Sequence, residues 1–195
     1  DTVRASGGNN DKRILICNTY AAGASNTMIS GFKLPTDTIE NRIIVEAHVY
    51  QPFYFTHENY PDTVSWSQGQ VTPQLRALYN SFVMNNIPVL IGEFGTADKD
   101  NNVARVSYAK FYVDYCTQYG MRCIWWDNGT QYKVYNRKTL EVSNPQMIDA
   151  MVTEARGGNY VVDTTLHGDT NDNGELDEED IAVLEARKLN IPIVA

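Results

Sequence analysis

The sequence predicts an α/β protein built on a parallel sheet. Four short apolar runs of strand length recur, at residues 13–20, 42–50, 87–93 and 121–126. Segments with the apolar periodicity of helices alternate with these runs, as in repeated β-α units. No glycine-rich phosphate loop follows any of the four runs, which disfavours a nucleotide-binding sheet. A doubly wound sheet and a piece of a (β/α)8 barrel are the two architectures that fit this order.

The helices are predicted over residues 25–30, 72–86, 104–120 and 144–155. Thr72 as N-cap and Pro73 at the first helical position predict the start of one of them. Gly120 favours the left-handed conformation that ends another. Asn144 and Pro145 repeat the cap and proline signal. The first ten residues are typical of the end of a helix.

The composition of the chain limits the kinds of partner that it can bind. The 195 residues suffice for one domain and a small appendage. A formal net charge of −8 argues against nucleic acid and anionic membranes, which need basic patches, and no run reaches transmembrane length. Cys17, Cys116 and Cys123 lack CxxC spacing, so we expect small buried hydrophobes, with a Cys116–Cys123 bridge left open.

The acidic charge is concentrated at the carboxyl end of the chain. Residues 168–195 contain eight acids and two bases, so they account for −6 of the net charge. This shift in composition predicts three parts: a domain over residues 1–155, a linker over 156–167 and an acidic module over 168–195.

Several polar and aromatic residues fall at the carboxyl ends of the predicted strands, where barrel enzymes keep their catalytic groups. His48 and Tyr50 are two residues apart and so face the same way, Glu93 ends the next strand, and Trp126 ends the last. Alone, each has a structural interpretation as a satisfied histidine, an ion-pair partner or a packing aromatic. Together they favour sugar chemistry, in which a carboxylate stabilises an oxocarbenium-like transition state and an indole stacks on a sugar ring.

Six motifs in order resemble family 5 glycoside hydrolases, in the branch of endo-β-1,4-glucanases and xyloglucanases. They are VRASGGNN, NTYAAG, EAHVYQPF, IPVLIGEFGTADKDN, CIWWDNG and YNRKTLE, and the resemblance covers residues 1–152. It implies a retaining (β/α)8-barrel enzyme and makes the expected fold class the C-terminal half of that barrel, strands five to eight, followed by a small helical calcium-loop tail.

The resemblance also implies roles for individual residues. Glu93 would be the nucleophile at the end of strand seven, and His48 and Tyr50 would orient it from strand six. Trp126 would lie beneath the sugar, and Asp127 and Asn128 would line the same subsite. Trp66, in the loop after the second strand, is either a further sugar platform or a packing residue.

We expect this chain to lack the second carboxyl group that a retaining glycosidase needs. The family keeps its general acid in an Asn-Glu-Pro stretch, and no Asn-Glu dipeptide occurs in this sequence. We therefore expect the acid upstream of Asp1, in a longer natural protein. Glu46, deeper than the rim at a position where the family has a small residue, and Glu58 in the loop are the other candidates. An open half-barrel would pair with a missing N-terminal half or a second copy.

The acidic module contains a calcium-loop pattern from Gly168 to Asp180. The oxygen ligands would come from Asp169, Asn171, Asn173, Glu175 through its carbonyl, Asp177 and Asp180, with Gly174 at the turn. A solvated acidic run before a helix is the alternative. The pattern resembles one dockerin repeat, which implies a cohesin-bearing scaffold as partner, although a complete dockerin has two repeats.

The expected function is that of a secreted, extracellular bacterial endo-β-1,4-glucanase acting on β-glucan polysaccharide, cellulosomal if the tail binds a scaffold. The alternative is a catalytically inert half-barrel that binds carbohydrate or docks a scaffold. The sequence does not distinguish cellulose, mixed-linkage glucan, xyloglucan and xylan as substrates.

Overall fold

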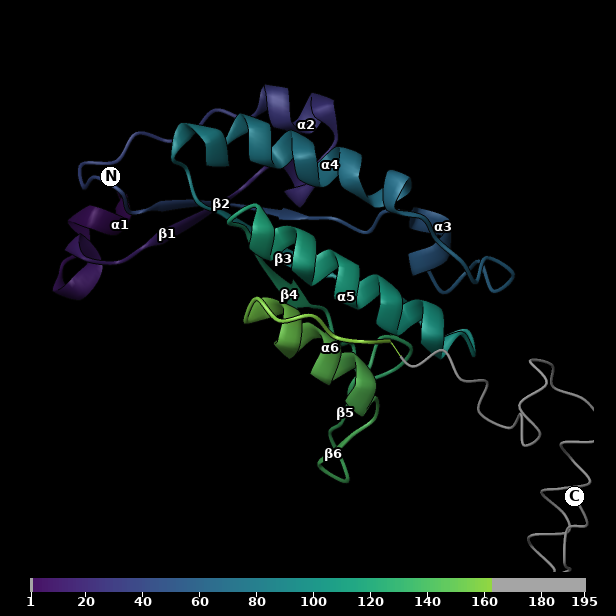
Figure 1. Cartoon of the computed structure of the whole chain (residues 1–195). Helices are drawn as coiled ribbons and strands as arrows, with labels where there is room; N and C mark the ends of the chain where they lie inside the picture. Colours follow the sequence, from purple (N-terminus) through teal and green to yellow (C-terminus); the bar gives the residue numbers. More distant parts are fainter. Residues whose placement is uncertain (1, 163–195) are drawn as a thin grey trace, which may run out of the picture. The chain divides into compact units, whose positions relative to one another are not determined.

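The computed structural model describes residues 2–162, which form an α/β unit on a four-stranded parallel sheet (Figure 1). The strands are β1 (Leu15–Asn18), β2 (Ile43–His48), β3 (Val89–Phe94) and β4 (Arg122–Trp125). They lie in the sheet in chain order, β1-β2-β3-β4. A doubly wound sheet reverses its strand order at a switch point, so this order favours the barrel-type architecture.

The helices of the described region vary widely in length. The α-helices are α1 (Thr2–Ala5), α2 (Asn26–Gly31), α3 (Phe53–Thr56), α4 (Gln68–Ser81), α5 (Asn102–Gln118) and α6 (Pro145–Ala155). Short 3-10 turns are η1 (Gly8–Asp11), η2 (Tyr20–Ala22) and η3 (Val83–Asn85). A small antiparallel hairpin, β5 (Tyr135–Asn136) and β6 (Glu141–Val142), which the sequence did not predict, precedes α6.

Helices α2, α4, α5 and α6 cover one face of the sheet, each in contact with the next (Figure 1). Val45 and Ala47 of β2 and Ile91 of β3 are fully buried beneath them, with Leu75 and Leu78 of α4 in the same apolar cluster. Burial of apolar surface contributes roughly 25 cal/mol per Å², so this layer is the main source of stability for the unit.

The opposite face of the sheet has apolar side chains in solvent. Ile16 of β1 is 54% exposed and Ile124 of β4 is 52% exposed. Within residues 2–162, β1 pairs only with β2 and β4 only with β3, which leaves an unpaired edge on each side of the sheet. Continuous apolar runs are typical of strands that are covered on both faces, but within residues 2–162 Ile16 and Ile124 on this second face remain uncovered.

Helix α4 begins five residues earlier than predicted, at Gln68 and not at Pro73. Its N-cap is Ser67, whose backbone N–H donates to Gln70 Oε1 at 2.9 Å in the manner of a capping box. Pro73 therefore lies inside the helix and not at its first position. A proline near the start of a helix removes one internal hydrogen bond, and the cap and the buried face of α4 outweigh that loss.

The other helix signals agree with the structure. Gly120 follows α5 with a φ of 69°, in the left-handed region. Asn144 caps α6 by accepting a hydrogen bond from the Met147 N–H at 3.1 Å. All three cysteines are free, so the Cys116–Cys123 bridge is not formed; Cys116 is buried, and Cys17 and Cys123 are half-buried.

The predicted calcium-loop positions from Asp169 to Asp180 lie outside the described residues. Among residues 2–162, no helix is long and apolar enough to cross a membrane. The same part of the chain holds no group of three or more potential metal-ligating side chains.

The cap of α6 can be tested by Asn144→Ala. Its side chain caps the helix and also donates to Asn102 Oδ1 at 2.6 Å, so the change removes two polar contacts. We expect the free energy of unfolding to fall by about 1–2 kcal/mol in urea denaturation. Asn80→Ala, on the exposed side of α4, is the control, with an expected change below about 0.5 kcal/mol. Equal losses in both variants would contradict the capping role.

Candidate active site

A β-bulge at Gly92 determines which way Glu93 points. Ala47 of β2 lies opposite Ile91, but the next pair is His48 opposite Glu93, so Gly92 is the extra residue on β3. Ile91 faces the helices. Simple alternation would turn Glu93 to that same side, whereas one inserted residue turns it to the side of His48.

The Glu93 carboxylate is held by two neighbours on β2 and the segment after it. The Tyr50 hydroxyl donates to Glu93 Oε2 at 2.9 Å, and His48 Nδ1 lies 3.2 Å from the same oxygen. The Glu93 side chain remains 30% exposed. Burial, and then the adjacent Glu93 carboxylate, raise the pKa of Tyr50 far above its usual value, so the phenol remains a hydrogen-bond donor.

Glu93 opens into a pocket of about 230 Å³ at the carboxyl ends of the strands. The pocket is lined by Tyr50, Phe53, Thr56, His57, Glu93, Trp126 and Tyr132. The Trp126 indole is 38% exposed and meets the Tyr50 ring edge to face at 6.3 Å. A carboxylate next to an exposed indole suits a ligand with both hydroxyl groups and an apolar face, as a sugar ring has.

Three tyrosine hydroxyls fix the loop that carries Tyr50. Tyr112 donates to the carbonyl of Val49 at 3.2 Å and Tyr108 to that of Gln51 at 3.1 Å, both from α5. Tyr132 donates to the carbonyl of Thr56 at 2.9 Å. The core thus extends to the rim of the pocket, and buried polar groups there are satisfied.

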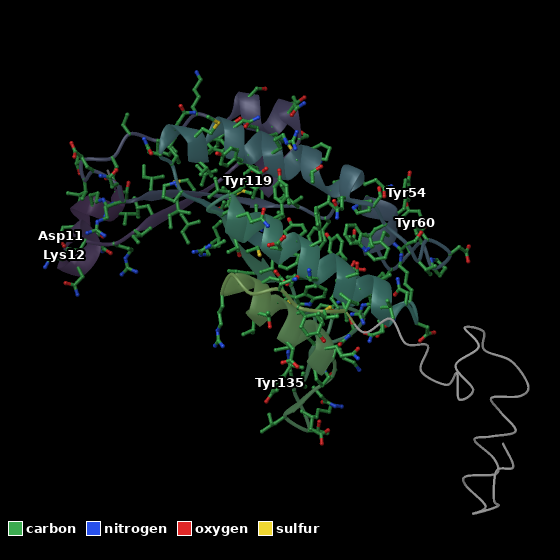
Figure 2. All side chains as sticks on the ribbon, viewed as in Figure 1. Asp11, Lys12, Tyr54, Tyr60, Tyr119 and Tyr135 are labelled. Carbon is green, nitrogen blue, oxygen red and sulfur yellow. The ribbon has the colours of Figure 1, made fainter. Side chains whose placement is uncertain are left out.

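Sequence reasoning missed part of the pocket lining. Phe53, His57 and Tyr132 were not identified, although the loop after β2 is visibly rich in aromatic residues. Tyr54, in α3, and Tyr60, in the loop after it, lie close together, with ring centroids 4.7 Å apart (Figure 2). The local sequence does not show which of these aromatic rings face Glu93, because that depends on the tertiary fold.

Trp66 packs against the protein. Its Nε1–H donates to the carbonyl of Ala104 at 3.0 Å, and its indole contacts the rings of Tyr108 and Phe111. It does not line the pocket. Of the two roles that the sequence left open, the structure assigns the packing role.

Asp127 holds a loop and does not line the pocket. Its carboxylate accepts hydrogen bonds from the backbone N–H groups of Gly129 at 2.7 Å, Val134 at 3.0 Å and Tyr135 at 3.2 Å. Partial burial acts to raise the pKa of Asp127, but these hydrogen bonds and the nearby Arg137 guanidinium lower it below the usual value.

Asn128 has a similar structural part. Its Oδ1 accepts from the N–H groups of Thr130 at 2.9 Å and Tyr132 at 3.1 Å. The structure thus shows a loop-holding role for Asp127 and Asn128, and the subsite role that the resemblance implies for them stays a prediction. They position Tyr132, which does line the pocket.

The two alternative acids lie away from the pocket. Glu46 is 6% exposed, and its Oε1 lies 2.9 Å from His48 Nε2, on the far side of that ring from Glu93. Glu58 is exposed on the loop and does not line the pocket. Glu93 is thus the one carboxylic acid among the pocket-lining residues in the described part of the chain.

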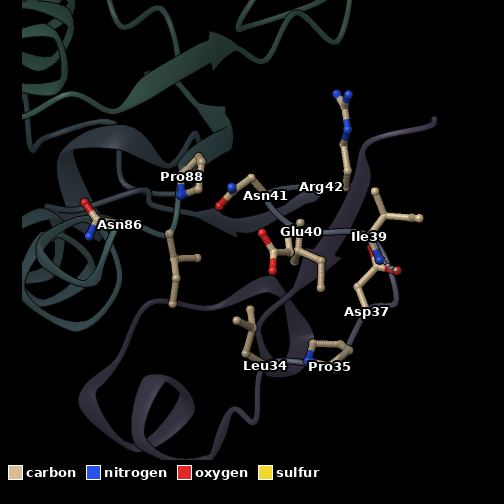
Figure 3. A pocket seen from close by; sticks show the side chains of 11 residues that line it. Leu34, Pro35, Asp37, Ile39, Glu40, Asn41, Arg42, Asn86 and Pro88 are labelled. Carbon is tan, nitrogen blue, oxygen red and sulfur yellow. Dashed lines mark hydrogen bonds between the residues drawn. The ribbon is translucent and has the colours of Figure 1, made fainter. Parts of the chain in front are cut away.

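A second pocket, of about 270 Å³, lies at the opposite end of the strands (Figure 3). Its lining includes Glu40 and Arg42 just before β2 and Pro88 just before β3. Asp37, also in the lining, accepts from Arg4 Nε at 2.9 Å. In barrel enzymes this end of the strands serves stability and the other end serves catalysis.

The strand order and the groups around Glu93 define a candidate active site at the carboxyl ends of the strands of a barrel-type α/β fold. The model of the cellulase family, glycosyl hydrolase family 5, matches residues 1–132. The chain belongs to this family.

Relatives with assigned names agree with the family. Endoglucanase B of Clostridium cellulovorans is 33% identical over 199 residues, covering 95% of this chain and 44% of the relative. The cellulase/esterase CelE of Acetivibrio thermocellus is 33% identical over 213 residues, covering 95% of this chain and 26% of the relative.

Solved structures agree as well. A broad-specificity endoglucanase from Ruminococcus champanellensis with bound cellotriose has a TM-score of 0.71 and 41% identity, covering 77% of this chain and 46% of that one. A mutant lichenase from a Caldicellulosiruptor species in complex with cellotetraose has a TM-score of 0.72 and 37% identity, covering 80% and 46%. The chain spans less than half the length of each of these four proteins.

The role of Asp127 can be tested by Asp127→Asn at two pH values. A lowered native pKa means that the carboxylate contributes stability above its unfolded pKa of roughly 3.9, and loses it as pH falls through the native value. We expect a lower urea midpoint than wild type at pH 7 and a smaller difference at about pH 3. Asp149→Asn, on the exposed side of α6, is the control and should change little at either pH. A difference that grows on acidification would contradict this role.

Proposed function

We propose that this protein is a retaining glycoside hydrolase that cleaves β-1,4-glucan chains internally, with Glu93 as the nucleophile. The observation that carries the proposal is the Glu93 carboxylate, oriented by Tyr50 at 2.9 Å and open to a pocket beside Trp126. The names of the relatives and the cello-oligosaccharides bound in solved neighbours support this substrate class. Because such polymers lie outside the cell, we also propose that the protein is secreted.

The contacts of Glu93 suit nucleophilic attack. Tyr50 and His48 both approach Oε2. Within residues 2–162, Oε1 has no hydrogen-bond partner, so it is the oxygen available to the anomeric carbon. The Trp126 indole would stack on the sugar ring that carries this carbon. His48 and Tyr50 would stabilise the Glu93 carboxylate when it departs as the leaving group in the second step. In the proposed retaining mechanism, attack by this oxygen forms a covalent glycosyl-enzyme intermediate.

The reaction needs a second carboxyl group roughly 5 Å from the nucleophile, to protonate the leaving oxygen. Glu46 lies behind His48 and Glu58 lies outside the pocket, so neither is suited to that role. We propose that the acid comes from outside the described residues, on an N-terminal half-barrel that covers Ile16 and Ile124. The lengths of the relatives and the two unpaired edges of the sheet support this, and a second copy of the chain is the alternative.

The nucleophile can be tested without the general acid. A dinitrophenyl β-cellobioside, fluorinated next to its anomeric carbon, carries a leaving group that departs unprotonated, and the fluorine slows release of the covalent intermediate. We expect the 195-residue chain to gain the mass of one fluorocellobiosyl group, found on Glu93 by peptide mass spectrometry. Glu93→Gln should not be labelled.

The same reagent separates the competing functions. Label on another residue would overturn the role of Glu93. Binding of cello-oligosaccharide without any label would instead favour the inert carbohydrate-binding module. On carboxymethylcellulose or xyloglucan we expect little hydrolysis by this chain alone, because the slow step then requires the proton donor.

We further propose that the acidic module binds calcium through the six positions from Asp169 to Asp180, and that it is a candidate docking element for a cohesin-bearing scaffold. The support is the spacing of oxygen-bearing residues around Gly174. Calcium there would be structural and would take no part in catalysis.

The calcium proposal can be tested by titration calorimetry of the chain with calcium chloride. We expect a heat of binding in the wild type and its loss in Asp169→Ala, which removes the first ligand of the loop. Asp172→Asn, at a position that the loop pattern does not use as a ligand, is the matched control and should still bind. A heat that Asp169→Ala leaves unchanged would remove the metal assignment.

A further inference from the structure

Glu46 is a buried carboxylate that the proposed reaction does not use directly. It lies on β2 at 6% exposure, and burying an acid costs free energy unless it is partnered. It has a partner on each oxygen: His48 Nε2 is 2.9 Å from Oε1, and Asn18 Nδ2 donates to Oε2 from the neighbouring strand. A carboxylate with a partner on each oxygen belongs to a buried polar network and is not an unpaired buried charge.

The backbone of β3 makes the room for Glu46. A Cβ atom added at Gly92 would overlap Glu46 Oε1, so no residue with a side chain fits there without displacing the carboxylate. Gly92 is also the bulged residue that turns Glu93 toward His48. One glycine thus admits Glu46 behind the histidine and presents Glu93 in front of it.

The His48 ring lies between the two carboxylates. Its Nε2 faces Glu46 at 2.9 Å, and its Nδ1 faces Glu93 at 3.2 Å. The hydrogen bond at one imidazole nitrogen fixes the ring orientation and so decides what the other nitrogen presents. Truncating Glu46 would leave the ring free to turn away from Glu93.

We propose that Glu46 is a positioning residue, which holds the His48 imidazole through Nε2 so that Nδ1 stays directed at the Glu93 carboxylate. This inference rests on the proposed function for its catalytic meaning, but the contact itself can be measured without turnover. Asn18 and Gly92 support the arrangement from the strands on either side. Glu46 would therefore act on the reaction through His48 and not by touching substrate.

Proton NMR of the 195-residue chain reports the contact directly. An imidazole N–H that donates to a buried carboxylate gives a downfield, slowly exchanging proton signal, which nitrogen-15 labelling assigns to Nε2 of His48. We expect this signal in the wild type and in Glu93→Gln, and its loss in Glu46→Ala and His48→Ala. Glu46→Gln should retain a weaker signal, because the amide oxygen still accepts.

Glu154→Ala is the matched control for general destabilisation. Glu154 is another buried acid, on α6, with Tyr160 N–H and Lys110 as its partners. We expect this variant to lower stability while leaving the His48 signal in place. Loss of the signal in Glu154→Ala, or its persistence in Glu46→Ala, would overturn the proposal.

The labelling rate of Glu93 by the fluorinated cellobioside gives the functional readout. Misplacing a group that acts on the reacting atoms slows chemistry by about tenfold to a hundredfold, and we expect a loss in that range for Glu46→Ala at unchanged affinity for the reagent. In a His48→Ala background, adding Glu46→Ala should cause no further loss. The same fold loss in both backgrounds would overturn positioning through His48. A wild type that is never labelled would refute the proposed function, while the NMR signal would still decide the role of Glu46.

Discussion

The β-bulge at Gly92 is the constraint on which the site depends. It breaks the alternation of β3 after Ile91, so that Glu93 faces His48 and Tyr50 and not the helices. The same glycine leaves the space that Glu46 occupies. A bulge redirects side chains and interrupts the local strand pairing. Here one inserted residue decides on which face Glu93 lies and leaves room for Glu46 behind His48.

The pocket is an extension of the hydrophobic core. Tyr108 and Tyr112 are fully buried in α5, yet their hydroxyls reach the backbone on either side of Tyr50. Asp127 acts in the same way on the other rim, because it fastens the loop that brings Tyr132 to the pocket. Residues that sequence motifs assign to a site can thus hold its loops in place. Such rigid support keeps the catalytic groups correctly positioned.

The bare face of the sheet is the other physical constraint. Ile16 and Ile124 lie more than half exposed on the face that also carries His48, and the sheet has an unpaired edge at β1 and at β4. Exposed apolar strand surface and free edges favour association with further strands. The proposed N-terminal half-barrel would therefore do two things at once. It would cover this face of the sheet, and it would supply the second carboxyl group.

The sequence by itself determined the parallel α/β order, the ends of α5 and α6, and the set of residues at the strand ends, because apolar periodicity and capping residues are local signals. The two-residue spacing of Glu46 and His48 also places both side chains on the same face of β2. Tertiary structure alone decided that Trp66 packs, that Asp127 and Asn128 bind a loop, that α4 begins at Gln68, and that Gly92 is bulged. The packing of Trp66 and the bulge at Gly92 depend on contacts between residues far apart in the chain, which no local pattern encodes. The cap of α4 and the loop contacts of Asp127 and Asn128 are short-range, and there the folded structure selects one of several local patterns that the sequence allows.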